Sequence, residues 1–144
     1  MKKSVIKKEF QVSSALAEVQ KASARVLQLL KPLTLSEACL FDIRLCLEEA
    51  LINAMKYGNK LRKEIPVGLQ IEYDEEEIRI RVEDQGEGFK LKILKSCTED
   101  ENVWKFGGRG IYLIHQLMDE VAYNEKGNSL LMVKRLRNPL SACG

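Results

Sequence analysis

The stretch that decides the fold is VGLQIEYDEEEIRIRVEDQGEGF, residues 67–89. Apolar residues alternate with polar or small ones over residues 67–73 and again over 78–83, and the acidic run 74–77 separates the two segments. An alternation with a period of two is typical of a strand with one buried face, and two such segments joined by a short polar turn predict a β-hairpin. We therefore expect a sheet with one apolar face at the centre of the fold.

Helical spacing precedes this hairpin. Apolar residues recur every three or four positions over residues 14–30 and again from about Thr34 to Gly58, which predicts two amphipathic helices. Thr34-Leu35-Ser36-Glu37 has the pattern of a capping box, in which Thr34 and Glu37 bond each other's backbone N–H. Gly58 and Asn59 tolerate the left-handed turn that ends a helix.

The remaining elements complete one layer of strands and one of helices. Residues 4–12 alternate loosely and predict an edge strand, and residues 111–118 predict a third helix after a long polar loop. Residues 121–123 and 130–133 predict a second hairpin. This order predicts an α+β two-layer sandwich, with a mixed, mostly antiparallel sheet and helices on one face.

Composition places the chain among globular proteins. It has 144 residues, of which 45% are apolar and 31% charged, so we expect one domain over residues 1–144. The 23 lysines and arginines outnumber the 21 acidic residues only slightly, and both signs are scattered along the sequence. A basic surface of the kind that binds nucleic acid is therefore not expected.

The sequence also argues against export and against a metal centre built from cysteines. The polar N-terminus has no apolar signal-peptide core, and no run of about 18 apolar residues could span a bilayer. We therefore expect a cytoplasmic protein that makes no membrane contact. The four cysteines form no C-x-x-C pair and the chain has one histidine, so we expect reduced cysteines and no zinc site.

The first polar motif is Glu48-Glu49-Ala50-Leu51-Ile52-Asn53-Ala54, in the second predicted helix. Glu49 and Asn53 are four residues apart, so they lie above one another on one side of that helix. A carboxylate and a carboxamide arranged in this way can hold a metal-bound phosphate between them. Taken alone, such a pair is more often a solvated part of a helix surface.

Two glycine-containing motifs follow. In Glu83-Asp84-Gln85-Gly86-Glu87-Gly88-Phe89, which comes directly after a predicted strand, Asp84 can accept a hydrogen bond from an exocyclic amine and the glycines let a flat ligand approach the backbone. Phe106-Gly107-Gly108-Arg109-Gly110-Ile111 opens the third predicted helix, where free N–H groups and the helix dipole favour an anion. A simple turn and an ordinary helix entrance remain the alternatives for the two motifs taken separately.

The order of the three motifs is more informative than any one of them. Neither the G-x-x-x-x-G-K-[ST] phosphate loop nor the G-x-G-x-x-G dinucleotide pattern occurs in the chain. The succession of E-x-x-x-N on a helix, D-x-G-x-G-F after a strand and G-x-G at a helix start resembles the N, G1 and G2 boxes of the histidine-kinase-like ATPase superfamily. That superfamily includes the ATP-binding domains of gyrase, heat-shock chaperones, mismatch-repair proteins and histidine kinases.

Within this superfamily the chain most resembles the anti-sigma-factor serine kinases. Residues 48–54 are similar to their E-A-x-x-N-A box, and residues 108–111 with 118–121 are similar to their G-R-G-[LIM] helix that ends in M-D-E-V. Lys56-Tyr57-Gly58 departs from their usual Glu-His-Gly-like run and is closer to sensor histidine kinases. Glu49 favours the serine kinases, because sensor kinases usually carry Asn at that position.

The resemblance implies a site for ATP and Mg²⁺. Asn53 would coordinate the Mg²⁺ ion, and Glu49 would act as the catalytic base toward a serine hydroxyl. Asp84 would accept the amino group of adenine, which guanine lacks at that position. The other residues implied to bind the nucleotide are Gly86, Gly88, Lys105, Gly108, Arg109, Gly110 and Ser129.

The function implied is that of an ATP-dependent protein-serine kinase that sequesters a sigma factor and phosphorylates the antagonist protein that releases it. Such kinases generally form homodimers, and the first strand and helix are candidate contact surfaces. Two other functions stay open. One is a nucleotide-gated binding module without turnover, and the other is a separate sensor-kinase catalytic domain that phosphorylates a histidine of another chain.

Overall fold

The computed structural model describes residues 5–86 and 108–136, and its strands form one five-stranded sheet. The strands are β1 (Ile6–Val12), β2 (Val67–Tyr73), β3 (Glu77–Glu83), β4 (Glu120–Tyr123) and β5 (Ser129–Arg135). Their order across the sheet is β1-β2-β3-β5-β4, and each neighbouring pair is antiparallel. Both predicted hairpins and the edge position of the first strand are confirmed. The mostly antiparallel character of the predicted sheet is confirmed, but the described strands include no parallel pair, so the mixed part of that prediction is not observed.

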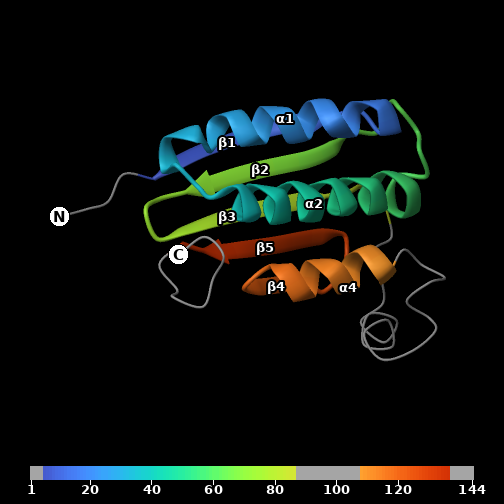
Figure 1. Ribbon diagram of the computed structural model, residues 1–144. Coiled ribbons are helices and arrows are strands. Elements are labelled where there is room, and N and C mark those ends of the chain that lie inside the picture. The colour runs from blue at the N-terminus through green and yellow to red at the C-terminus, as the bar shows by residue number, and fades with distance from the viewer. Residues whose placement is uncertain (1–4, 87–107, 137–144) are drawn as a thin grey trace.

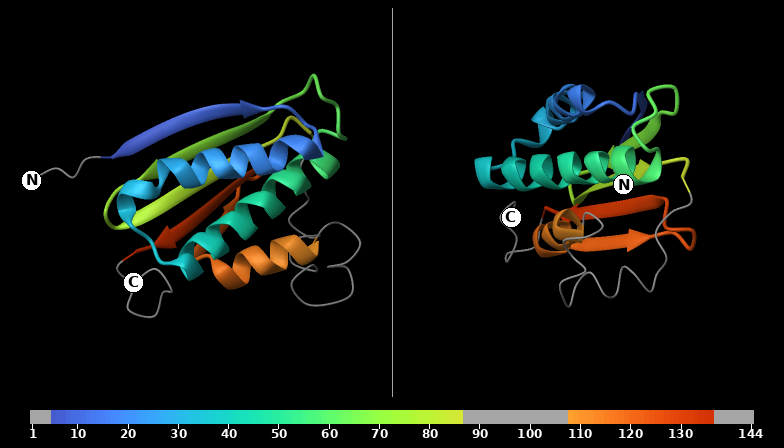
Figure 2. Two further views of the ribbon diagram at one scale, coloured as in Figure 1. Left: turned by 45° about the horizontal axis from the view of Figure 1, so that its top comes forward. Right: turned by 90° about the vertical axis from the view of Figure 1, so that its right-hand side faces the viewer.

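The helices of the described residues lie together on one side of this sheet, as Figures 1 and 2 show. They are α1 (Val19–Leu29), α2 (Glu37–Asn53) and α4 (Gly108–Leu117), with short 3-10 turns at Leu16–Glu18 and Lys31–Leu33 and a π-helical turn at Ala54–Gly58. α2 lies between α1 and α4 and contacts both. The predicted α+β two-layer sandwich is thus confirmed. Of the described helices, not one has the combined length and apolar character that crossing a bilayer requires.

The core lies between α2 and the central strands. The alternating residues of β2 and β3 that face the helices are buried: Val67, Leu69, Ile71, Tyr73, Ile78, Ile80 and Val82. Ile43, Leu47 and Leu51 recur every four residues along α2 and are fully buried in the same core. Each such aliphatic side chain contributes about 1.5–3 kcal/mol of transfer free energy on burial. This packing fixes which side of α2 faces the sheet.

The start of α2 differs from the prediction. Ser36 is the N-cap, because its Oγ accepts the Cys39 N–H at 3.1 Å. Thr34 instead ends the preceding 3-10 turn in a left-handed conformation, with φ 48°, and its hydroxyl donates to the Leu33 carbonyl. The predicted capping box is therefore wrong. Both residues have a side chain suited to capping. Of the two, only Ser36 has the extended backbone conformation that an N-cap residue typically adopts.

The end of the helix also differs from the prediction. Asn59 has φ −91°, and the left-handed residues are Lys60 and Leu61. The π-helical turn carries the chain beyond Gly58, and the Leu61 N–H returns to the Met55 carbonyl at 2.7 Å. The left-handed turn thus lies directly after Gly58 and Asn59, the two residues that the sequence indicated. Gly58 and Asn59 make other contacts, which are described below.

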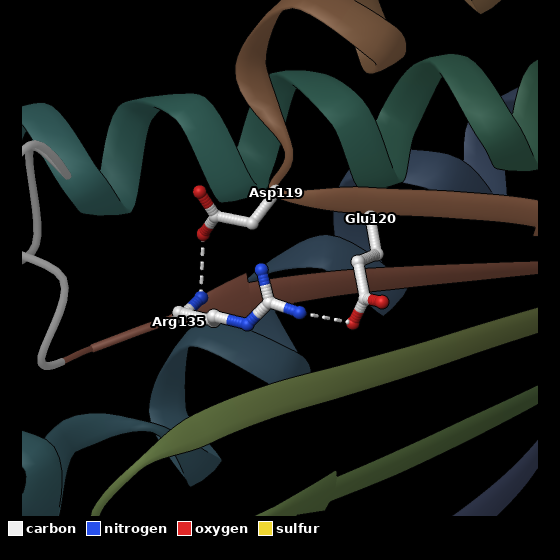
Figure 3. A network of polar contacts seen from close by, with 3 residues as sticks. All are labelled: Asp119, Glu120 and Arg135. Atoms are coloured by element: carbon white, nitrogen blue, oxygen red, sulfur yellow. Dashed lines mark hydrogen bonds and ion pairs between the residues drawn. The ribbon is translucent and has the colours of Figure 1, made fainter.

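The C-terminal end of α4 is tied to the sheet by the segment after it (Figure 3). Asp119 Oδ2 accepts the backbone N–H of Arg135 at 2.6 Å, and Glu120 Oε2 lies 2.9 Å from Arg135 Nη2. The buried Lys134 ammonium donates to the Leu117 carbonyl at 2.8 Å, where a cation is favoured by the helix dipole. The M-D-E-V segment therefore fixes α4 against β5.

The cysteine prediction holds only in part. Cys46 is a free thiol in the core, and burial, followed by the nearby Asp42 carboxylate, raises the pKa of this thiol to about 12. A thiol with this pKa is unreactive at neutral pH. Cys39, however, takes part in a disulfide bond, so the expectation of reduced cysteines is wrong for this residue.

Candidate functional site

The structure brings the first two sequence motifs to one cavity. Asn53, the last residue of α2, and Asp84, the residue after β3, are both buried, with 6% and 7% of their surface exposed. Both line a cavity whose walls are Ala50, Asn53, Ala54, Val82, Asp84, Tyr123, Asn128 and Leu130. The cavity is narrow, with room for about one water molecule. A ligand larger than water must therefore displace side chains or extend out of it.

The third motif meets the first where α4 starts. A Cβ atom added to Gly110 would lie 2.4 Å from Glu49 Oε2 and 3.3 Å from Asn53 Nδ2. A larger residue at position 110 would push the end of the Glu49 side chain aside and press on Asn53, so glycine here lets both side chains keep their places beside α4. The first turn of α4, a position where backbone N–H groups favour anions, therefore lies against the Glu49 carboxylate and the Asn53 carboxamide.

The two adjacent glutamates of α2 have different surroundings. Glu49 lies beside Gly110 and on the same side of the helix as Asn53. Glu48 lies one position further round the helix, where its Oε2 is 4.0 Å from Arg44 Nε. Only Glu49 is therefore placed to act with Asn53 on a common ligand.

Tight packing surrounds the carboxylate of Asp84. Its Oδ1 accepts the Gly86 N–H at 2.8 Å. A Cβ atom at Gly58 would lie 2.2 Å from Asp84 Cγ, and one at Gly86 would lie 2.3 Å from the Gly58 carbonyl oxygen. Gly58 and Gly86 are thus required by packing around Asp84. The sequence motifs predict Gly86 at the site, whereas they indicate Gly58 only as a residue at the end of the second helix.

The backbone of Asp84 is held by the hairpin that joins β4 and β5. The Asp84 N–H donates to the Asn128 carbonyl at 2.8 Å, and Asn128 Nδ2 donates to the Asp84 carbonyl at 2.9 Å. Asn128 also lines the cavity. The resemblance to the kinase family implies its neighbour Ser129 instead.

Ser129 is not brought to the cavity. It pairs with Glu83 across the sheet, and its Oγ lies 3.5 Å from Arg81 Nη1. Leu130, the next residue, lines the cavity, and successive residues of a strand point to opposite faces. Ser129 therefore lies on the face of the sheet without helices, away from the cavity, and its contact with the nucleotide stays a prediction.

The other predicted residues are described only in part or not at all. Gly108 and Arg109 are the first two residues of α4. Gly88 and Lys105 lie outside the described residues. The part of the site that the structure assembles is therefore Glu49, Asn53, Asp84, Gly86 and Gly110.

The chain is similar to known proteins over most of its length. Residues 12–134 match the family described as histidine kinase-like ATPase domain. A serine-protein kinase RsbW from Staphylococcus epidermidis is 36% identical over 104 residues, which cover 67% of this chain and 65% of the relative. RsbW of Staphylococcus aureus strain MRSA252 is 33% identical with the same coverage. RsbW of Listeria innocua is 30% identical over 100 residues, or 65% of this chain and 64% of the relative. The matched part thus spans slightly less than two thirds of each relative's length.

Proposed function

Because the chain belongs to the histidine kinase-like ATPase domain family, we propose that it binds ATP with Mg²⁺ and transfers the γ-phosphoryl group to a serine of another protein. The observation that carries this proposal is the junction of Glu49 and Asn53 with Gly110, next to the cavity that contains Asp84. The choice of serine is supported by the relatives named serine-protein kinase and by a carboxylate at position 49.

The donor set at this junction suits Mg²⁺. This ion usually keeps several waters and takes only one or two protein oxygens together with substrate phosphates. Within residues 5–86 and 108–136 no group of three or more acidic, histidine or cysteine side chains is placed to hold a metal ion. The Asn53 carboxamide lies beside the start of α4 and offers a single side-chain oxygen, which fits the more open kind of site. When bound, the ion would neutralise charge on the phosphates.

Glu49 is the proposed general base. Its carboxylate would accept the proton of the serine hydroxyl as the serine oxygen bonds to the γ-phosphorus. The bond from that phosphorus to the β–γ bridging oxygen breaks, and ADP leaves with the bonding electrons. Gly110 leaves no side chain between the start of α4 and this carboxylate, so the group is open to the phosphate side of the site.

The proposed partners are a sigma factor, which the protein would sequester, and an antagonist protein, which it would phosphorylate. Phosphorylation adds nearly two negative charges to the antagonist, enough to weaken an interface and return the sigma factor to this protein. A homodimer is also proposed. β1 supports it as a contact surface, since it is one of the two edge strands of the described sheet and its residues are largely exposed.

The deciding experiment is phosphoryl transfer from radiolabelled ATP to a candidate antagonist. An acid-stable phosphoserine on the antagonist is the expected product. An acid-labile phosphohistidine would instead identify a sensor-kinase activity. Specific ATP binding without any transfer would leave a nucleotide-gated binding module, and absence of ATP binding would refute the proposal altogether.

Binding of ATP and Mg²⁺ is expected to stabilise the fold. At a free concentration 100 times the dissociation constant, a ligand that binds only the folded state adds about 2.7 kcal/mol to the free energy of unfolding. Thermal unfolding followed by circular dichroism should therefore show a raised midpoint with ATP and Mg²⁺. GTP at the same concentration should raise it less, and an equal shift with both nucleotides would contradict the adenine preference assigned to Asp84.

The affinity for ATP is expected to fall on acidification. Burial raises the pKa of Asp84 above its ordinary value, and the Gly86 N–H opposes this rise only in part. Only the ionised carboxylate is a pure acceptor for the adenine amino group, so ATP binding should weaken as the pH falls through this raised pKa. The stability of the protein without nucleotide should change in the opposite direction. The folded state holds the Asp84 proton more tightly than the unfolded chain does, so the free energy of unfolding falls as the pH rises through the raised pKa and Asp84 ionises.

Calorimetric titrations at several pH values test this expectation with a matched pair of variants. Asp84→Asn should bind ATP more weakly at neutral pH and lose the acid-dependent step. Asp74→Asn is the control, since Asp74 likewise accepts the N–H two residues ahead, from Glu76 at 2.7 Å, but at the other end of β3. If ATP binding by Asp84→Asn still weakened on acidification, the Asp84 carboxylate would not be the group that accepts the hydrogen bond from adenine.

A further inference from the structure

The buried residue Asn59, directly after the π-helical turn, makes four side-chain hydrogen bonds. The residue is 2% exposed. Its Nδ2 lies 3.1 Å from Ser14 Oγ, 3.1 Å from the Ile65 carbonyl oxygen and 3.2 Å from the Pro66 carbonyl oxygen. Its Oδ1 accepts the Gln85 N–H at 2.8 Å. The carboxamide therefore joins three separate segments of the chain.

The chemistry of these partners requires a carboxamide. The two carbonyls can only accept hydrogen bonds, and the Ser14 hydroxyl already donates to the Ile65 carbonyl at 2.5 Å, so this side of the cluster needs a donor. The Gln85 N–H needs an acceptor. Aspartate would supply no donor, and alanine would supply neither group. Leaving such groups buried without partners is costly, so the residue type is set by its contacts.

The bond to Gln85 reaches the adenine end of the proposed site. Gln85 lies between Asp84, whose carboxylate is the proposed adenine acceptor, and Gly86, whose N–H orients that carboxylate. On the other side, Asn128 bonds both backbone groups of Asp84. Asn59 and Asn128 together form an asparagine clamp, which holds the turn 84–86 from the π-helical turn and from the β4–β5 hairpin.

We propose that Asn59 is a positioning residue that sets the direction of the Asp84 carboxylate and thereby controls nucleobase recognition. This inference rests on the proposed ATP site and deepens it. Asn59 bonds the turn that carries Asp84, whereas the phosphate side of the site is formed by Glu49, Asn53 and Gly110. Loss of the Asn59 side chain should therefore weaken discrimination between bases more than it weakens the contacts to phosphate.

The test compares Asn59→Ala with Ser14→Ala. Both substitutions disturb the same buried cluster, but Ser14→Ala leaves the Asn59–Gln85 bond in place. Dissociation constants for ATP and GTP are measured with Mg²⁺ by competition against a fluorescent nucleotide. Asn59→Ala should weaken ATP binding by about tenfold or more, as loss of an outer-shell hydrogen bond does in other preorganised sites, and change GTP binding much less. Ser14→Ala should keep the wild-type ratio.

Amide hydrogen exchange gives a readout that does not depend on nucleotide. The Gln85 N–H should exchange slowly in the wild type and in Ser14→Ala, and faster in Asn59→Ala. An unchanged ratio of ATP to GTP affinity in Asn59→Ala, with Gln85 exposed to exchange, would overturn the inference. A wild-type protein that binds no ATP would overturn the proposed function instead. If Asn59→Ala does not fold, Asn59→Ser, whose hydroxyl is too short to bond both sides, carries the same test.

Discussion

Replacing Asn53 with alanine is expected to abolish Mg²⁺-dependent ATP binding. Asn53 is 6% exposed at the end of α2, and its carboxamide faces both the cavity that contains Asp84 and the start of α4. It is the one oxygen donor that the proposal assigns to the ion, so its loss should cost more than the roughly 10- to 100-fold typical of outer-shell partners. Phosphoryl transfer should disappear with it.

The measurement is a calorimetric titration with ATP, with Mg²⁺ present and with Mg²⁺ removed by a chelator. The wild type should lose most of its affinity on chelation, and Asn53→Ala should bind weakly in both conditions. Circular dichroism and thermal unfolding without nucleotide show whether the variant folds. Wild-type affinity of a folded Asn53→Ala protein would remove Asn53 from the site and, with it, the proposed role of the α2 motif.

Replacing Glu49 with glutamine is expected to slow transfer while leaving nucleotide binding intact. Glutamine keeps the shape of the side chain beside Gly110 but cannot accept the serine proton. Loss of a general base typically lowers the rate about 10²- to 10⁴-fold. The effect should appear in the rate constant for serine phosphorylation at saturating ATP, with the dissociation constant for ATP close to that of the wild type.

Glu48 provides the matched control for this experiment. It is the neighbouring glutamate on the same helix, is only partly exposed, and pairs with Arg44 at 4.0 Å. Glu48→Gln should lose a surface ion pair worth at most about 1 kcal/mol and retain the wild-type transfer rate. Equal rates in Glu49→Gln and the wild type would show that another group takes the proton. Equal losses in both glutamate variants would point to the stability of α2 rather than to catalysis.

Local periodicity predicted most of the secondary structure. The alternation over residues 67–83 gave the central hairpin, and the spacing in 111–118 gave α4 to within a few residues. The motif order also predicted that Asn53 and Asp84 share a cavity, which they do. The predictions of strands and helices succeeded because each depends on a repeat of two or about 3.6 residues, which is set by the geometry of the backbone itself.

In two places the structure favours a polar residue close to the one that the sequence indicated. Thr34 and Ser36 both have capping side chains, and Asn128 and Ser129 both have polar side chains next to a strand. The sequence could not separate Asn128 from Ser129, because a shift of one residue in a strand reverses the face to which every side chain points. It could not separate Thr34 from Ser36, because the backbone conformation before α2 decides which of them caps the helix. Packing of β5 against β3 placed Ser129 opposite Glu83 and left Asn128 to bond Asp84.

The sequence by itself thus determined the strands and helices and the residue types of the site. Only the tertiary structure decided that Gly58 packs on Asp84 and that Asn59 bonds Ser14 and Gln85, which are 45 and 26 residues away. Periodic patterns report a residue's position on its own element. The partners of a buried carboxamide or the neighbour of a glycine depend on how separate elements pack, and no local pattern encodes those contacts.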